Sequence, residues 1–147
     1  MTLSEMLQRS ELERLAAGKR EVSGLITKAS RRLEEAGNED NYGDSRLEFA
    51  YLTVLFCATA ALRASGYRAT RGEGHHVRTL DTLLYTLHVS PEKVEYYHML
   101  RRARNTALYD ELLEVSEVVL VEALNAAREL LGLTEAWLRK HHPQLLP

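Results

Sequence analysis

The chain has 147 residues, of which 45% are hydrophobic and 27% are charged, and its formal net charge is −2. This size and composition are typical of one globular domain, which we expect to cover 1–147 with its core in about 10–140. The small net charge excludes a protein that binds polyanions through its overall charge. Any contact with nucleic acid therefore needs a local basic patch.

Three features predict where the protein works. There is no continuous run of about 18 apolar residues, so we expect no membrane contact. The first residues are amphipathic and include acidic side chains, which is typical of neither a secretory signal nor a transit peptide. The single cysteine, Cys57, lies among apolar residues and is expected to be a buried thiol. Together these features predict a cytoplasmic protein of a prokaryote.

The spacing of apolar residues predicts three helices in the first part of the chain. The first helix covers about 3–17, and the second covers 19–36 and ends at Gly37. The clearest loop follows directly after that glycine. A third helix over 45–65 carries apolar residues at i, i+3, i+4 and i+7 and has a second apolar flank. This pattern predicts a helix at the centre of a bundle or under a partner subunit.

The next part of the chain begins with a predicted flexible basic loop over 67–74. A short helix follows, beginning at His76 or Thr79. A longer helix is predicted over 90–113, because a serine is a good N-cap and the proline after it suits the first helical position.

A final helix is predicted to begin after an N-cap at Ser116 and to continue to about Lys140. No stretch alternates between apolar and polar residues over the length of a strand. The predicted fold class is therefore all-α, an up-and-down bundle of four main helices plus shorter helices.

The helix predicted over 90–113 has two chemically different faces at about 100° per residue. One face is an apolar stripe that we expect to face the core, formed by Tyr96, Met99, Leu100, Ala103 and Ala107. The other face is basic and polar, with His98, Arg101, Arg102, Asn105 and Tyr109, and Arg104 at its edge. This second face is either a solvated helix surface or a surface that binds phosphate groups or RNA.

Three short blocks of sequence stand out in the chain. Residues 104–110 read Arg-Asn-Thr-Ala-Leu-Tyr-Asp, residues 46–51 read Arg-Leu-Glu-Phe-Ala-Tyr, and residues 74–76 read Gly-His-His. Together these blocks resemble the HEPN domain family. HEPN domains are small helical domains of prokaryotic toxin–antitoxin and defence systems, and the resemblance covers about 10–140. Their usual signature is an arginine, often followed by asparagine, then a short spacer and a histidine. This chain resembles a branch in which a tyrosine ends the signature.

The resemblance implies a site for RNA chemistry that needs no metal ion and no cofactor. In HEPN ribonucleases the active site is assembled across a dimer, so the resemblance also implies a homodimer. Arg104 then takes the role of the signature arginine, whose fork can hold two phosphate oxygens. Asn105 positions the phosphate or the opposing arginine, and Tyr109 stands where the histidine is usual. These three are the candidate catalytic residues.

The tyrosine at position 109 leaves more than one function open. A phenol has an ordinary pKa near 10, whereas imidazole has one of about 6.5, so Tyr109 is a poor base at pH 7 and His98 is a substitute on the same face. A binding role survives this difference. The candidate phosphate- or RNA-binding residues are Arg101, Arg102 and His98, with His76 and Asp110 as secondary candidates.

Two alternatives to a ribonuclease remain. One is a non-catalytic HEPN module that binds a nucleotide or a partner nucleotidyltransferase-type antitoxin. The other is a structural dimer whose arginine face is only solvated. A zinc site is not expected, because His75 and His76 are adjacent, so their side chains point in different directions, and no cysteine or carboxylate matches them.

Overall fold

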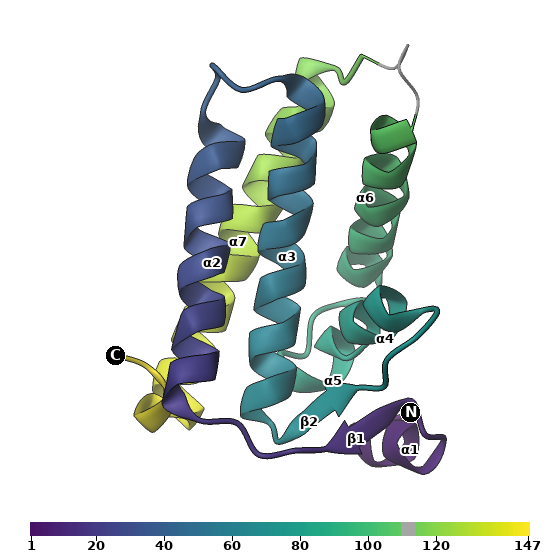
Figure 1. Ribbon diagram of the computed structural model, residues 1–147, viewed down its shortest axis with the longest axis vertical. Coiled ribbons are helices and arrows are strands. Elements are labelled where there is room, and N and C mark those ends of the chain that lie inside the picture. Colours follow the sequence, from purple (N-terminus) through teal and green to yellow (C-terminus); the bar gives the residue numbers. More distant parts are fainter. Residues whose placement is uncertain (110–113) are drawn as a thin grey trace.

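The computed structural model describes residues 1–109 and 114–147, without the side chains of 107–109 (Figure 1). Its helices and strands follow one another in chain order as α1 (Leu3–Gln8), β1 (Leu12–Arg14), α2 (Lys19–Gly37), α3 (Gly43–Ala64), β2 (Tyr67–Ala69), α4 (His75–Asp81), α5 (Leu83–Thr86), α6 (Pro91–Tyr109) and α7 (Glu117–His141), with a 3₁₀ turn at Pro143–Leu145.

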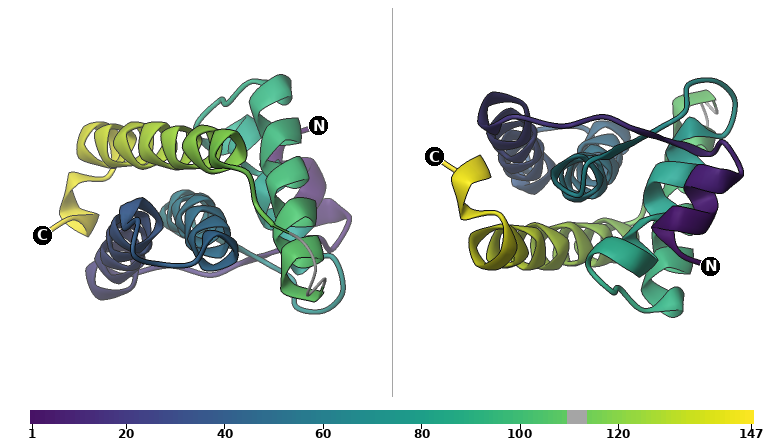
Figure 2. Two further views of the ribbon diagram at one scale, coloured as in Figure 1. Left: turned by 90° about the horizontal axis from the view of Figure 1, so that it is seen from above. Right: turned by 90° about the horizontal axis from the view of Figure 1, so that it is seen from below.

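The four long helices form an up-and-down bundle. In Figure 1, α2 and α6 run upward, and α3 and α7 run downward. The end-on views show α2 and α3 side by side against α7, with α6 at one end of this layer, beside α3 (Figure 2). The prediction of an all-α fold with four main helices is confirmed.

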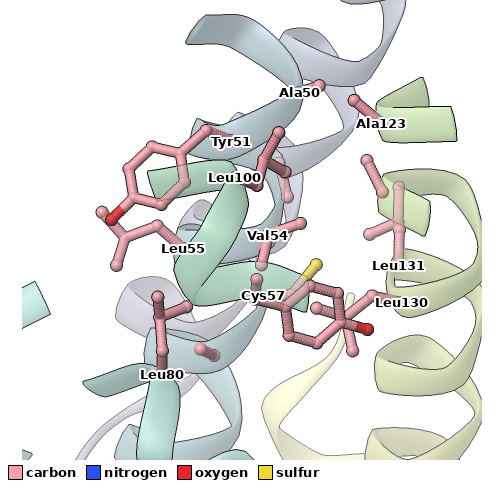
Figure 3. Packing of buried hydrophobic residues seen from close by; sticks show 14 of the residues in the cluster. Ala50, Tyr51, Val54, Leu55, Cys57, Leu80, Leu100, Ala123, Leu130 and Leu131 are labelled. Atoms are coloured by element: carbon pink, nitrogen blue, oxygen red, sulfur yellow. The ribbon is translucent and has the colours of Figure 1, made fainter. Parts of the chain in front are cut away.

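The core is built around α3, whose apolar side chains are buried on several sides. Tyr51, Val54 and Cys57 are fully buried, so the expected burial of the cysteine is confirmed. Figure 3 shows Val54 and Cys57 between Leu100 of α6 and the leucines of α7. A helix that is apolar on more than one side needs such neighbours around it.

By length and composition alone, α3 is long and apolar enough to cross a membrane. Its most apolar 18-residue window has a mean hydropathy of 1.4, but 67% of that window is buried inside the bundle. The central helix of a bundle has the same length and composition, so this observation is weak evidence for a membrane span.

Two serines begin long helices as the sequence predicts. The Ser90 Oγ accepts a hydrogen bond from the Lys93 backbone N–H at 3.3 Å, and α6 begins at the next residue. The Ser116 Oγ accepts one from the Val119 N–H at 3.3 Å, and α7 follows. Each hydroxyl satisfies a backbone donor that has no partner within the first helical turn.

The prediction for the N-terminal segment is wrong. The first helix ends at Gln8 instead of continuing to residue 17, and Ser10 has a positive φ of 60°. Residues Leu12–Arg14 then form β1, which pairs antiparallel with β2, so 67–69 are a strand and not part of a flexible loop. Strands of three residues are too short to show an alternating pattern, and only their pairing identifies them.

The predicted apolar stripe of α6 is also wrong in part. Met99 is 51% exposed, whereas Val94, Tyr97 and Leu100 are buried. His98, for which the helical periodicity predicts a position on the polar face, is only 8% exposed. The buried arc is rotated because α6 packs against α4 and α5 as well as α3, which no pattern within the helix itself indicates.

Candidate functional site

An open cleft of about 520 Å³ lies between the start of α4 and the second half of α6. The loop and helix side of the cleft is formed by residues 72–77, and the α6 side by Arg101 and Asn105. Gly72 and Gly74 have φ values of +117° and +80°, which favour glycine and let the chain turn sharply into α4. This turn brings the two histidines at the start of α4 beside the α6 arginines.

Arg101 is the cation that lines the cleft. Its Nε is buried and has no hydrogen-bond partner, and no carboxylate among the described residues forms an ion pair with it. No described residue accepts a hydrogen bond from this guanidinium, so its donors at the cleft are suited to an anionic ligand.

Arg104 is held inside the fold. Its Nη2 donates to Glu48 Oε1 of α3 at 2.9 Å, and its Nη1 donates to Asn105 Oδ1 at 3.1 Å. The guanidinium carbon lies 5.7 Å from the centre of the Tyr51 ring, and the side chain is 20% exposed. Arg104 therefore fixes the Asn105 amide at the cleft and links α6 to α3.

A tyrosine of α3 and a histidine of α4 are joined next to these arginines. The Tyr51 Oη and the His76 Nδ1 lie 3.0 Å apart. Burial raises the pKa of Tyr51 to about 12, although the two arginines act in the opposite direction, so the phenol keeps its proton at neutral pH. Burial also lowers the pKa of His76 below 6.5, and the nearby positive charges of His75, Arg104 and Arg101 lower it further. The His76 imidazole is therefore neutral at pH 7.

A family model described as the HEPN domain matches residues 22–137. The chain belongs to the HEPN domain family. HEPN domains are generally ribonucleases or nucleotide-binding modules, and they commonly dimerise. No curated protein and no solved structure matches the chain. The HEPN match includes every residue that lines the cleft.

Two residues predicted for this HEPN site lie elsewhere. The His98 Nε2 is 2.7 Å from Asp81 Oδ1 at the end of α4, so this imidazole joins two helices and does not line the cleft. Arg102 is exposed, and its Nη2 donates to Glu95 Oε1 at 3.1 Å on the outer side of α6.

Two further predicted residues lie beyond what the structure describes. Tyr109 is the last residue of α6, but its side chain is outside the described part, as is the whole of Asp110. The predicted residues that the structure does bring together are therefore Arg101, Arg104, Asn105 and His76.

The sequence interpretation missed two residues that organise the HEPN site, Glu48 and Tyr51. They lie three positions apart and therefore share one side of α3. Both belong to the block 46–51 that carries the family resemblance, and this was the signal that could have identified them. Within the described ranges, no group of three or more His, Cys, Asp or Glu side chains could hold a metal ion.

Proposed function

We propose that this HEPN protein binds and cleaves RNA, without a metal ion, at the cleft of Arg101 and Asn105. It acts as a homodimer in the cytoplasm, as part of a prokaryotic toxin–antitoxin or defence system. The observation that carries the proposal is the position of Arg101, whose guanidinium lines the cleft and forms no hydrogen bond or ion pair with any described residue. A phosphodiester offers the acceptor oxygens that this guanidinium lacks.

Asn105 supports a phosphate at the same position. Its Oδ1 accepts from Arg104, and this leaves the amide N–H groups as donors beside Arg101. A cation and a neutral donor on one face bind a phosphate through both charge attraction and directional hydrogen bonds. The Glu48 carboxylate is bound to Arg104 and forms no hydrogen bond or ion pair with Arg101.

A second copy of the chain fits the electrostatics of this proposal. Two clefts facing each other across a twofold axis bring two sets of arginines together, and their repulsion is relieved by a polyanion between them. Sedimentation analysis without and with a short RNA measures this. We expect a dimer that RNA stabilises, and a monomer in both conditions contradicts the dimer proposal.

A second candidate function is a non-catalytic module that binds a nucleotide or a nucleotidyltransferase-type antitoxin. The observation that favours it is that Arg104, the signature arginine, already donates to Glu48 and Asn105. The tyrosine at position 109 also favours this second candidate, since a phenol is a weak base at neutral pH. The cleft then holds the phosphates of a nucleotide without cleaving them.

The binding test uses a labelled single-stranded RNA in EDTA, followed by fluorescence anisotropy. Arg101→Ala removes the cleft cation, and Arg139→Ala is a matched control because Arg139 is an exposed arginine on α7, paired with Glu135. We expect weaker binding only in Arg101→Ala. Equal binding by wild type and Arg101→Ala contradicts the proposed site, and competition by a mononucleotide without any RNA cleavage favours the second candidate.

A further inference from the structure

We infer that His76 is the group that accepts the proton in this cleft, and that Tyr51 positions it. The inference rests on the proposed function. It names a base for the proposed RNA cleavage, because the tyrosine at position 109 is a poor base at neutral pH. The usual HEPN histidine belongs to the signature itself, whereas His76 comes from α4, 28 positions before Arg104 in the chain.

The position of His76 relative to its neighbours is the first argument. It is the second residue of α4 and lines the same cleft as Arg101 and Asn105, which come from α6. Its Nδ1 is 3.0 Å from the Oη of Tyr51, whose side chain is fully buried on α3. The two imidazole nitrogens point in different directions, so this contact directs Nδ1 toward the core and leaves Nε2 on the other edge of the ring.

The contacts that hold Tyr51 in place are the second argument. The Arg104 guanidinium lies 5.7 Å from the centre of the Tyr51 ring, and Glu48 in turn binds Arg104. The Tyr51–His76 ring centroids are 6.0 Å apart. Residues of α3 and α6 therefore fix the orientation of the His76 imidazole. A catalytic group needs such a fixed orientation relative to its substrate.

The charges that surround His76 set its protonation state. The groups facing it are His75 on its own helix, Arg101 and Arg104 on α6, and the Tyr51 phenol on α3. Burial and these cations lower its pKa, which keeps the ring neutral and able to accept a proton. In the tautomer that carries its proton on Nδ1, the ring donates to the Tyr51 oxygen and Nε2 has the lone pair.

The chemical step balances without a metal ion or a further reactant. Nε2 of His76 takes the proton of a ribose 2′-hydroxyl, and the 2′-oxygen forms a bond to the adjacent phosphorus. The bond between phosphorus and the 5′-oxygen breaks, that oxygen takes a proton from water, and the hydroxide that remains takes the proton held by His76, which returns the imidazole to its neutral form. The products are a 2′,3′-cyclic phosphate and a 5′-hydroxyl, while Arg101 and the Asn105 amide bind the phosphate oxygens as their charge increases.

Other candidates for the base are less well placed. His98 contacts Asp81 at 2.7 Å and does not line the cleft. His75 lines the cleft, with its ring centroid 5.9 Å from that of His76, but no contact to a buried side chain among the described residues orients it.

The experiment measures the rate of cleavage of a short RNA against pH in EDTA, together with RNA affinity. The variants are His76→Gln, His75→Gln and Tyr51→Phe, with His141→Gln at the end of α7 as the control. We expect His76→Gln to lose about 100-fold or more in rate while its RNA affinity stays within about twofold. His141→Gln should match wild type.

The shape of the profile separates a base from a structural residue. The wild-type rate should rise with pH to a plateau, with a midpoint below 6.5, because the neutral ring is the active form. Tyr51→Phe should retain affinity, lose several-fold in rate and shift the midpoint to lower pH, because the phenol oxygen no longer stabilises the protonated ring.

The outcomes distinguish this inference from the proposed function. Wild-type cleavage that is lost in Arg101→Ala but retained in His76→Gln, with an unchanged profile, overturns the role of His76 and leaves the proposed function standing. RNA binding without any wild-type cleavage overturns the proposed cleavage as well. Nitrogen-15 NMR of the imidazole tests the inference independently of activity: a proton on Nδ1 supports it, and a neutral ring with its proton on Nε2 contradicts it.

Discussion

Two arginines of this protein show how partners decide what a guanidinium does. Arg63, near the end of α3, is 5% exposed, and its guanidinium binds both carboxylate oxygens of Glu21 at 2.9 and 3.1 Å. It also donates to the backbone carbonyls of three residues, Leu15, Ala16 and Tyr67. Arg101 on α6 is only half-buried, and its buried Nε has no partner among the described residues.

The comparison teaches that the pairing of an arginine, and not its presence, indicates a binding site. Arg63 connects the segment before α2, α2 itself and β2, so its donors are used by the fold. Arg104 is intermediate, because its two terminal nitrogens are bound by Glu48 and Asn105 while its Nε, like that of Arg101, has no partner among the described residues. Arg101 is the member of this series whose whole guanidinium forms no hydrogen bond or ion pair with a described residue.

The largest expected effect is on stability, at Arg63. The substitution Arg63→Met should lower the free energy of unfolding by about 3 kcal/mol, because it leaves three carbonyls and the Glu21 carboxylate without their donor. Chemical denaturation followed by circular dichroism measures this. At a temperature where the variant is folded, its RNA affinity should stay within about twofold of wild type. A loss of RNA affinity in the folded variant would weaken the comparison.

The next effect is on binding, at Arg101. Arg101→Ala should cost about 2 kcal/mol of RNA-binding free energy, since a charge-assisted hydrogen bond to phosphate is lost. It should also reduce the slope of log affinity against log salt by about 1. Its unfolding free energy should change by about 0.5 kcal/mol or less, as for other substitutions without buried partners. Anisotropy titrations at several salt concentrations measure both quantities, and an unchanged slope contradicts a direct phosphate contact.

A smaller effect is expected at Glu48, where one substitution should change both the stability of the fold and the affinity for RNA. Glu48→Gln should reduce the unfolding free energy by about 1 kcal/mol, because its bond to Arg104 loses one charge while the pair is partly exposed. The same variant should bind RNA more tightly, since a carboxylate near the cleft is removed. Denaturation and anisotropy on one preparation test both signs, and weaker binding would show that the carboxylate has a positioning role.

The smallest effect is on the pH dependence of stability. Burial lowers the pKa of His76 and of His142 below the unfolded value of about 6.5. The unfolded chain therefore binds more protons than the folded chain below that pH, and the free energy of unfolding should fall as pH is lowered from 7 to 5. His76→Gln should make this dependence shallower. A steeper dependence in the variant would place the pKa of His76 above that of the unfolded chain.

The sequence predicted most of what is local in this fold. Ser90 and Ser116 begin helices as expected, and the apolar spacing identified α3 as the central helix. Helix caps and amphipathic stripes depend on residues within a few positions of one another, so they can be read from the chain. The strand at 12–14 could not, because its partner lies more than fifty positions away.

The site was predicted in its residue types but not in its connections. Arg101, Arg104 and Asn105 were identified, but the Glu48 contact of Arg104 spans 56 positions and the Tyr51–His76 contact spans 25. His98 shares a helix with these residues, and only the packing of α4 shows that it faces Asp81 instead of the cleft. Contacts between distant segments depend on how the helices pack, which periodicity does not determine.

The most direct test of the central claim is a ribonuclease assay on total RNA in EDTA with wild type, Arg101→Ala and the exposed-arginine control Arg139→Ala. The three proteins should first show the same helical content and the same oligomeric state. We predict cleavage by wild type and by Arg139→Ala, and a loss of cleavage in Arg101→Ala. Cleavage by Arg101→Ala at the wild-type rate would contradict the assignment of this cleft as the RNA site.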